Sequence, residues 1–167
     1  MMGMAALRFA TLLALAVWIG GLLALGAVAA PAVFQVVADK GVPAGRVLSG
    51  AIVGEVLRRF HLIGYACGAL ILFALIVRAV LGPRPRRFAV RVAIAAIMLA
   101  ASLYSGLMTS AGITRIHAEI GEDLSPSSLP AGDARRARFD RLHRQATLLH
   151  FVPLIGGLAL LFWEMGD

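Results

Sequence analysis

Four long runs without a charged residue dominate this sequence, at residues 9–38, 60–77, 92–114 and 145–163. A helix needs about 20 mostly apolar residues to cross the hydrocarbon core of a bilayer, and flanking arginines lengthen the shorter runs by extending their charged ends to the headgroups. Backbone groups inside a bilayer must be hydrogen-bonded internally, which leaves helices or closed barrels. The alternation of period two that is typical of barrel strands is missing. The sequence therefore predicts an all-α integral membrane protein, a bundle of four transmembrane helices at about 7–34, 60–81, 90–112 and 143–164.

The composition fits this class and excludes two others. Hydrophobic residues make up 60% of the 167 residues and charged residues 15%. Such a chain is not disordered, because disorder requires low hydrophobicity, and a soluble domain of this size could not bury so much apolar surface. The net charge is +7, but the arginines lie between the apolar runs, as in loops that face anionic headgroups. We expect one membrane domain over residues 1–167, in contact with the lipid bilayer and with no nucleic-acid partner.

Two of the connections carry helical patterns of their own. Residues 43–59 show polar and apolar positions at helical spacing, Pro43 suits a first turn, and no breaker separates this stretch from the second span. In the third connection, residues 114–120 can continue the third helix, 121–132 form a loop rich in serine and proline, and 133–143 lead into the fourth span with Asp133 as N-cap. Helix two and the third connection are therefore predicted to project beyond one leaflet.

The turn at residues 82–88 is rich in arginine and contains no acidic residue. With four spans, this turn lies on the same side as both termini, and the two longer connections lie on the other side. A short basic loop favours the cytoplasmic side, so we expect the termini and the turn to be cytoplasmic in a bacterial-type inner membrane. The opposite orientation stays open, because ten Lys and Arg residues are spread over the longer connections. The first span is expected to remain as a helix, since its apolar run is longer than the core of a signal peptide.

Small residues recur at the spacing that lets helices approach closely in lipid. The pairs are Gly64 with Gly68, Ser102 with Gly106, and Gly50 with Gly54. They predict close packing within the bundle, and some of them are equally able to receive a helix from a partner protein.

Short motifs give the chain a family resemblance. Trp18-Ile19-Gly20-Gly21 is followed by Ala30-Pro31-Ala32-Val33-Phe34, and Arg138-Phe139-Asp140-Arg141-Leu142-His143 precedes the last span. These resemble motifs of a family of small four-helix membrane proteins of unknown function that includes transmembrane protein 205. The resemblance implies a fold and a membrane location but no activity. The chain departs from the family pattern at Ala146 and His150, where Ser and Asn are common. A weaker likeness is to copper-resistance membrane domains, which also combine Trp-x-Gly-Gly with histidines.

Three histidines are the candidates for a polar or ligand-binding site, because ionisable groups in a bilayer need a partner. His61 opens the second span and His143 opens the fourth, on the same side of the membrane. His150 follows His143 on the same helix face, about 10 Å further along the axis. One metal ion with bonds near 2 Å cannot take both, so a haem or copper site would pair His61 with one of them. The alternative is structural: headgroup contacts for His61 and His143, and for His150 a hydrogen bond to Tyr65, Tyr104 or Ser105.

Motifs for common enzyme classes are missing: a phosphate loop, His-Glu-x-x-His, Gly-x-Ser-x-Gly and Cys-x-x-Cys. Carboxylates are also absent from the interior of every predicted span, which argues against an ion-coupled transporter. The leading hypothesis is a non-enzymatic accessory or scaffold subunit of a membrane assembly, with a membrane-protein partner or self-association. The alternatives are a histidine-based haem or copper protein built on His61, His143 and His150, and a pocket or passage for small hydrophobic molecules.

Overall fold

The computed structural model describes residues 2–82, 84–121 and 124–166. Of these described residues 88% are helical, and no strand is found among them. The elements follow one another as α1 (Met2–Leu23), η1 (Ala24–Ala29), α2 (Ala30–Asp39), α3 (Gly45–Leu81), α4 (Phe88–Tyr104), η2 (Ser105–Thr109), α5 (Ser110–Ile120), η3 (Pro126–Ser128) and α6 (Ala134–Met165). The segments η1 and η2 are π-helical, and η3 is a single 3₁₀ turn.

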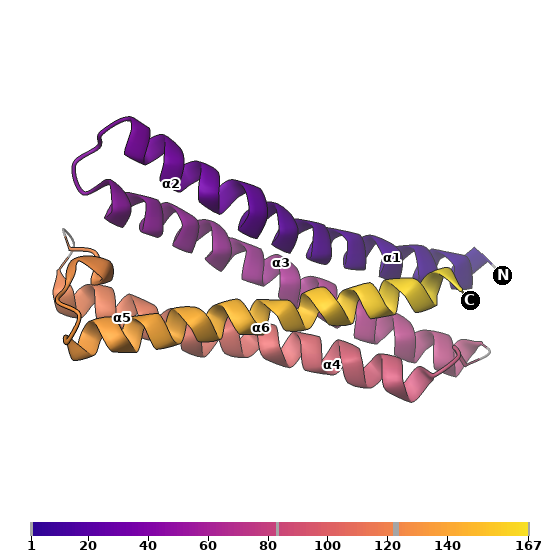
Figure 1. Cartoon of the computed structure of the whole chain (residues 1–167). Helices are drawn as coiled ribbons and strands as arrows, with labels where there is room; N and C mark the ends of the chain where they lie inside the picture. Colours follow the sequence, from indigo (N-terminus) through magenta and orange to yellow (C-terminus); the bar gives the residue numbers. More distant parts are fainter. Residues whose placement is uncertain (1, 83, 122–123, 167) are drawn as a thin grey trace.

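These elements form an antiparallel bundle of four long rods (Figure 1). The rods are α1–η1–α2, α3, α4–η2–α5 and α6, and within the described residues these are the four helices long and apolar enough to cross a membrane. The predicted fold class is therefore confirmed. Every rod is longer than its predicted span, because the connecting segments continue the helices. The second helix begins at Gly45, and the Asp133 side chain caps α6 by accepting a hydrogen bond from the Arg135 amide at 2.8 Å.

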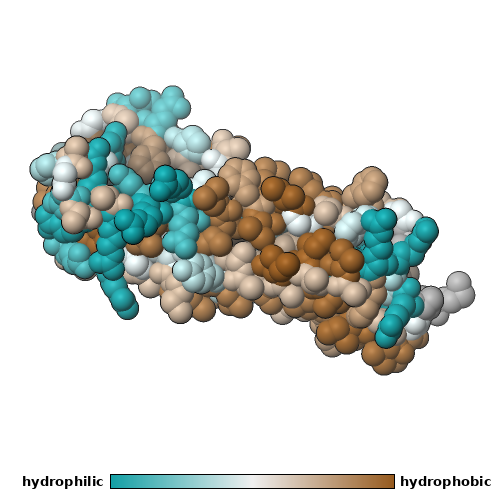
Figure 2. Space-filling model, turned by 60° about the horizontal axis from the view of Figure 1, so that its bottom comes forward, coloured by the Kyte–Doolittle hydropathy of each residue, from teal (hydrophilic) through white to brown (hydrophobic). Residues whose placement is uncertain are grey.

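The two longer connections lie at one end of the bundle, and the 82–87 turn lies at the other end with both termini (Figure 1). At the far end the two long connections meet, where Arg46 donates a hydrogen bond to the Ser127 hydroxyl at 3.2 Å. Hydrophilic residues cover both ends, and hydrophobic residues form a belt between them (Figure 2). Because lipid tails can cover such a belt and water cannot, its exposed apolar side chains indicate contact with the bilayer.

The tight core lies in the half of the bundle nearest the termini. Trp18 is 1% exposed, and its indole packs on α3 where Gly64 and Gly68 leave room: a Cβ on Gly68 would lie 3.1 Å from the ring. Gly157 of α6 similarly makes room for Ile19. The small residues of this half are therefore used inside the bundle. Buried residues of all four rods complete the core: Ala14, Leu15, Cys67, Ile71, Leu75, Ala95, Met98 and Leu160.

The carboxylate at the end of the fourth span is buried, which was not foreseen. Glu164, in the last turn of α6, is 1% exposed. Arg78 of α3 donates to both of its carboxylate oxygens, at 2.9 and 2.8 Å, and Arg91 of α4 donates to Oε1 at 2.8 Å. The expectation that Arg78 extends to the headgroups is wrong, because only 8% of its side chain is exposed. Arg8 donates to the Glu164 carbonyl, so this cluster ties all four rods together beside the termini.

Candidate functional site

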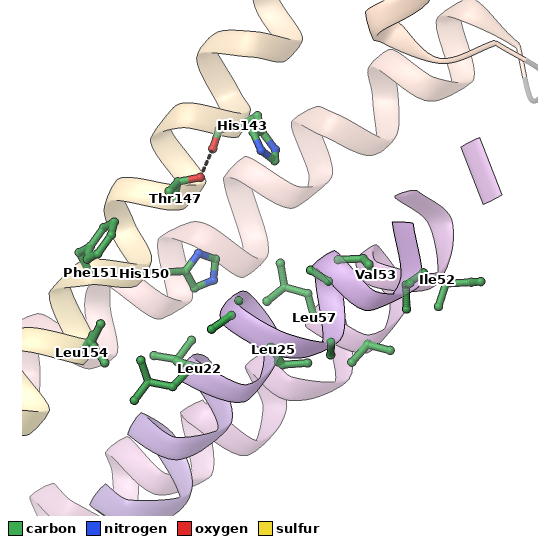
Figure 3. A pocket seen from close by; sticks show the side chains of 17 residues that line it. Leu22, Leu25, Ile52, Val53, Leu57, His143, Thr147, His150, Phe151 and Leu154 are labelled. Carbon is green, nitrogen blue, oxygen red and sulfur yellow. Dashed lines mark hydrogen bonds between the residues drawn. The ribbon is translucent and has the colours of Figure 1, made fainter. Parts of the chain in front are cut away.

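The other half of the bundle contains a cavity of about 530 Å³. It lies between the α1–η1–α2 rod, the first half of α3 and the middle of α6 (Figure 3). This volume falls within the range of about 300–1,000 Å³ that small-molecule sites occupy. The cavity is lined by Leu22, Leu23, Leu25, Gly26, Ala27, Ala29, Ala30, Val33, Ile52, Val53, Val56, Leu57, His143, Thr147, His150, Phe151 and Leu154.

Almost all of this lining is apolar, and its polar side chains come from one face of α6. His143, Thr147 and His150 are four and three residues apart, which places them in a row along the helix. Thr147 donates its hydroxyl proton to the His143 carbonyl at 3.0 Å. Figure 3 shows the His150 ring extending from α6 toward Leu25 and Leu57 on the opposite wall. No Lys, Arg, Asp or Glu is among the described residues that line the cavity.

His150 is also one half of a histidine pair. Its ring centroid lies 5.5 Å from that of His61 on α3, and the Tyr65 ring lies 6.0 Å from His61 on the other side. The Nε2 atoms of both histidines are buried and have no hydrogen-bond partner among the described residues. The Tyr65 hydroxyl instead donates to the Ser102 carbonyl at 3.4 Å. The hydrogen bond between His150 and a neighbouring side chain that would make it purely structural is not formed in this part of the chain.

The π-helical segment η2 packs against His61. A Cβ on Gly106 would lie 3.1 Å from the His61 ring and would collide with the Tyr65 hydroxyl, so glycine permits this close approach. Ser105 and Thr109 of the same segment are each 1% exposed. Their hydroxyl oxygens also lack a hydrogen-bond partner within the described residues. An unpaired polar group in a lipid-surrounded interior costs several kcal/mol, so these buried hydroxyl groups and the two imidazoles form a polar cluster inside an otherwise apolar bundle.

Three irregularities of the helical backbone surround this region. The Ala30 amide bonds to the Leu25 carbonyl and the Ser110 amide to the Ser105 carbonyl, five residues back, as in a π-helix. In α6, Pro153 lacks the amide that would bond to the carbonyl four residues earlier. Segment η1 lines the cavity, η2 adjoins His61, and Pro153 lies one turn from His150. Single π-helical turns are frequent at functional sites.

The motif that ends in His143 packs α6 against α5. The Phe139 ring stacks on His143 at 5.8 Å and receives the edge of His117 at 5.9 Å. Arg138 lies 3.8 Å from Glu119, and Leu142 occupies the space beside Gly112. His143 therefore lines the mouth of the cavity on one side and supports a helix contact on the other.

The motif at the start of the chain is largely structural. Trp18 is in the core, and Gly21 makes room for the Phe60 ring. A side chain at Gly20 would meet no other part of the bundle. Pro31 lies just after the π-helical segment η1 inside the first rod, where its missing amide leaves one backbone carbonyl of the rod without its usual partner. Phe34 is 41% exposed on the apolar belt.

The histidine pair is the part of the site with metal-binding capacity. His61 and His150 could supply two nitrogen ligands to copper or haem iron. Within the described residues, no group of three or more His, Cys, Asp and Glu side chains is placed to hold an ion. The structure brings His61, His150 and Tyr65 together. His143 lines the same cavity as His150, from the same face of α6.

Sequence reasoning named the Ser105 hydroxyl only as a hydrogen-bond partner for His150, and it missed the Thr109 hydroxyl and the contribution of η1 to the cavity. The signal was present for the hydroxyls: Ser102, Ser105 and Thr109 recur at spacings of three and four, which puts them on one face of an otherwise apolar helix. No sequence pattern that we used predicts a π-helical turn such as η1.

Comparison with known proteins places the chain by family. No curated protein and no solved structure matches it significantly. The family model described as a domain of unknown function (DUF4149) matches residues 13–122. That range holds the first rod from residue 13 onward, the second and third rods, and His61, and it ends before the α6 residues of the cavity. Since the match covers well over half of the sequence, the protein belongs to the DUF4149 family of membrane proteins of unknown function.

Proposed function

We propose that this protein binds a small hydrophobic molecule within the membrane, in the cavity between the first rod, α3 and α6. The role is non-enzymatic: the chain holds or presents the molecule and does not transform it. The observation that carries the proposal is the combination of an apolar cavity of about 530 Å³ with the unpartnered Nε2 of His150 at its wall. The cavity is open on one side, and its apolar wall offers packing contacts to an apolar molecule that enters it.

Two features of the fold support this role. The half of the bundle near the termini is closed by the Trp18 core and the Glu164 cluster, so it provides rigidity. The half that holds the cavity is built from η1, α2 and the start of α3, with exposed apolar side chains such as Val28 and Ile52. Residues 52–57 of α3 belong to the segment expected to project beyond the leaflet, and Glu55, Arg58 and Arg59 are exposed at the same level. We therefore propose that the cavity lies at the headgroup boundary and that a lipid-borne molecule enters it from there.

A cavity-filling substitution tests the proposal. The full chain in phosphatidylcholine nanodiscs is titrated with tritiated hexadecanol, and binding to protein-free nanodiscs is subtracted. We expect saturable binding by the unchanged protein and at least tenfold weaker binding by Val53→Trp, because the indole would occupy the cavity. Ile63→Trp, on the exposed face of the same helix, is the matched control and should bind as the unchanged protein does. Equal binding by Val53→Trp, or no saturable binding at all, would refute the proposal.

An accessory-subunit role is the second candidate, and a separate observation favours it. Gly50 and Gly54 of α3 have open space where a side chain would lie, whereas Gly64 and Gly68 of the same helix are filled from within the bundle. Small residues that face outward fit close approach by a helix of a membrane-protein partner or a second copy. Crosslinking from a photoreactive residue at position 54 in native membranes tests this: a discrete adduct is expected, and labelling of lipid alone would contradict it.

We also propose a bacterial-type inner membrane with cytoplasmic termini, on the strength of the arginines in the 82–87 turn. A membrane-impermeant maleimide tests this on single-cysteine variants in a Cys67→Ala background, since Cys67 is buried. In intact cells we expect Gly41→Cys and Gly132→Cys to be labelled and Arg86→Cys to be protected. The reverse pattern would invert the orientation, and labelling of Gly41→Cys without Gly132→Cys would contradict the four-span topology.

Kinship with the family of transmembrane protein 205 is likewise our proposal. It is supported by the Trp18–Gly21 and Ala30–Phe34 motifs, which lie inside the matched range of 13–122. The Arg138–His143 motif lies beyond that range and supports the kinship only through its sequence.

A further inference from the structure

The charges around the cavity limit the kind of molecule it can accept. No Lys, Arg, Asp or Glu is among its described lining residues, and the nearest described ion pairs belong to exposed residues of α3, such as Glu55 with Arg59. A phosphate, carboxylate or ammonium head that entered the cavity would lose its hydration without gaining an opposite charge, which is costly in an apolar site. The lining therefore selects against charged heads.

The same wall offers a neutral head a place to bind. A neutral imidazole carries one hydrogen-bond donor and one acceptor. The His150 Nε2 is buried, unpartnered and on a ring that extends into the cavity (Figure 3). His61, which is 6% exposed, lies directly behind it with its own Nε2 unpartnered. The His150 Nε2 can accept a hydrogen bond from a hydroxyl group or, in the other tautomer, donate one to a hydroxyl or carbonyl group. His61 is not among the described residues that line the cavity.

We infer that the occupant of the cavity is a single-chain lipid with an uncharged hydroxyl- or carbonyl-type head, which hydrogen-bonds to the His150 side of the His61–His150 pair. The apolar tail lies against the residues of η1 and α3, and His61 acts as a positioning residue for His150. This inference rests on the proposed function, and adds to it the chemical class of the molecule and the group that recognises it.

Two ligands that differ only in the head test the inference. Hexadecanol and hexadecane have the same tail, and their affinities for the full chain in phosphatidylcholine nanodiscs are compared directly. We expect hexadecanol to bind at least about tenfold more tightly, the ratio that the loss of a buried hydrogen-bond partner produces. We expect palmitate, whose head is charged at neutral pH, to compete no better than hexadecane.

Variants of the pair assign the preference to His150. In His150→Leu the preference for hexadecanol should fall to within about threefold, while hexadecane affinity is kept, because only hydrogen bonding is lost. His150→Gln retains a donor and an acceptor and should restore most of the preference. His117→Leu, on α5 outside the cavity lining, is the control and should leave the preference unchanged. His61→Leu should reduce the preference without abolishing the binding of hexadecane.

The outcomes that overturn the inference differ from those that overturn the proposed function. Equal binding of hexadecanol and hexadecane, with both weakened by Val53→Trp, would leave the cavity intact as a binding site and refute the head assignment. Stronger competition by palmitate than by hexadecanol would refute it as well. Copper(I) bound with a dependence on both His61 and His150 would also refute it, because a metal ion would then be the partner of the imidazoles. No binding of either ligand would refute the proposed function itself.

Discussion

Replacement of Glu164 by glutamine should strongly destabilise the protein. The carboxylate accepts three hydrogen bonds from Arg78 and Arg91 at 2.8–2.9 Å, and all three side chains are at least nine-tenths buried. The amide of the introduced glutamine would keep the shape but remove the negative charge that the two guanidinium groups share. Loss of one member of a buried charge cluster costs about 3–5 kcal/mol of unfolding free energy. For a domain of this size, that corresponds to a fall of roughly 6–20 °C in Tm.

The measurement is the thermal unfolding midpoint in one detergent, followed by gel filtration of the heated protein or by intrinsic fluorescence. Glu164→Asp keeps the charge and shortens the side chain, so it should fall between the unchanged protein and Glu164→Gln. Glu55→Gln removes a carboxylate from an exposed pair with Arg58 and Arg59 and should leave Tm within experimental error, because exposed ion pairs contribute little. If the Glu164→Gln protein is as stable as the unchanged one, the ion pairs of Glu164 do not stabilise the end of the bundle beside the termini, and the reasoning is refuted.

Two further predictions concern the helices themselves. Gly68→Ala places a methyl group 3.1 Å from the rigid indole of Trp18 and should lower the free energy of unfolding by about 1–3 kcal/mol through overpacking. Gly50→Ala faces open space and should raise the free energy of unfolding by about 0.5–1 kcal/mol. Equal Tm values for the two variants, or a lower Tm for Gly50→Ala in the absence of a partner, would contradict this packing. Hydrogen bonds from the Arg135 side chain and amide lower the pKa of Asp133 to about 2, so the cap contributes to stability above the unfolded value of 3.8, and its contribution falls as the pH drops from about 4 through 2. The amide NMR shift of Arg135 should titrate with a midpoint near 2 and lose this titration in Asp133→Asn, and a midpoint near 3.8 would contradict the cap.

The regular parts of this fold follow from the sequence because lipid imposes a simple rule. A bilayer of fixed thickness requires long apolar helices, so the rods, the Asp133 cap and the side on which each connection lies could all be predicted. Glycine spacing also predicted the close approach on α3, although it could not show that Trp18 is the side chain received there. Periodicity gives the face of a helix but not the neighbour that this face meets.

The Glu164 cluster was missed because a charged side chain near the end of a span can be stabilised in a bilayer in two ways. Arg78 and Arg91 lie only a few residues inside their spans, where an arginine can extend to the headgroups or turn inward to a partner. The presence of Glu164 at the same level of the fourth span decides between them. The alternating direction of the spans places all three residues at one end of the bundle. Comparing the depths of charged residues in the four spans would therefore have predicted the ion pairs of Arg78 and Arg91 with Glu164.

The cavity and the histidine pair depend on features that sequence patterns do not report. His61 of α3 and His150 of α6 come from different rods, and helical periodicity does not show which side chains of separate rods meet. Segment η1 widens the first rod beside the cavity, and η2 brings Gly106 against His61. Such π-helical turns insert one residue into a helix, and so shift every later side chain relative to a regular pattern.

Native mass spectrometry of the protein released from its own membranes tests the cavity assignment most directly. We expect the unchanged protein and Ile63→Trp to carry a single additional mass, and fragmentation of that adduct should yield an uncharged single-chain lipid. Val53→Trp should be released without it. A bare unchanged protein, or the same adduct on Val53→Trp, would contradict the assignment of this cavity as the binding site.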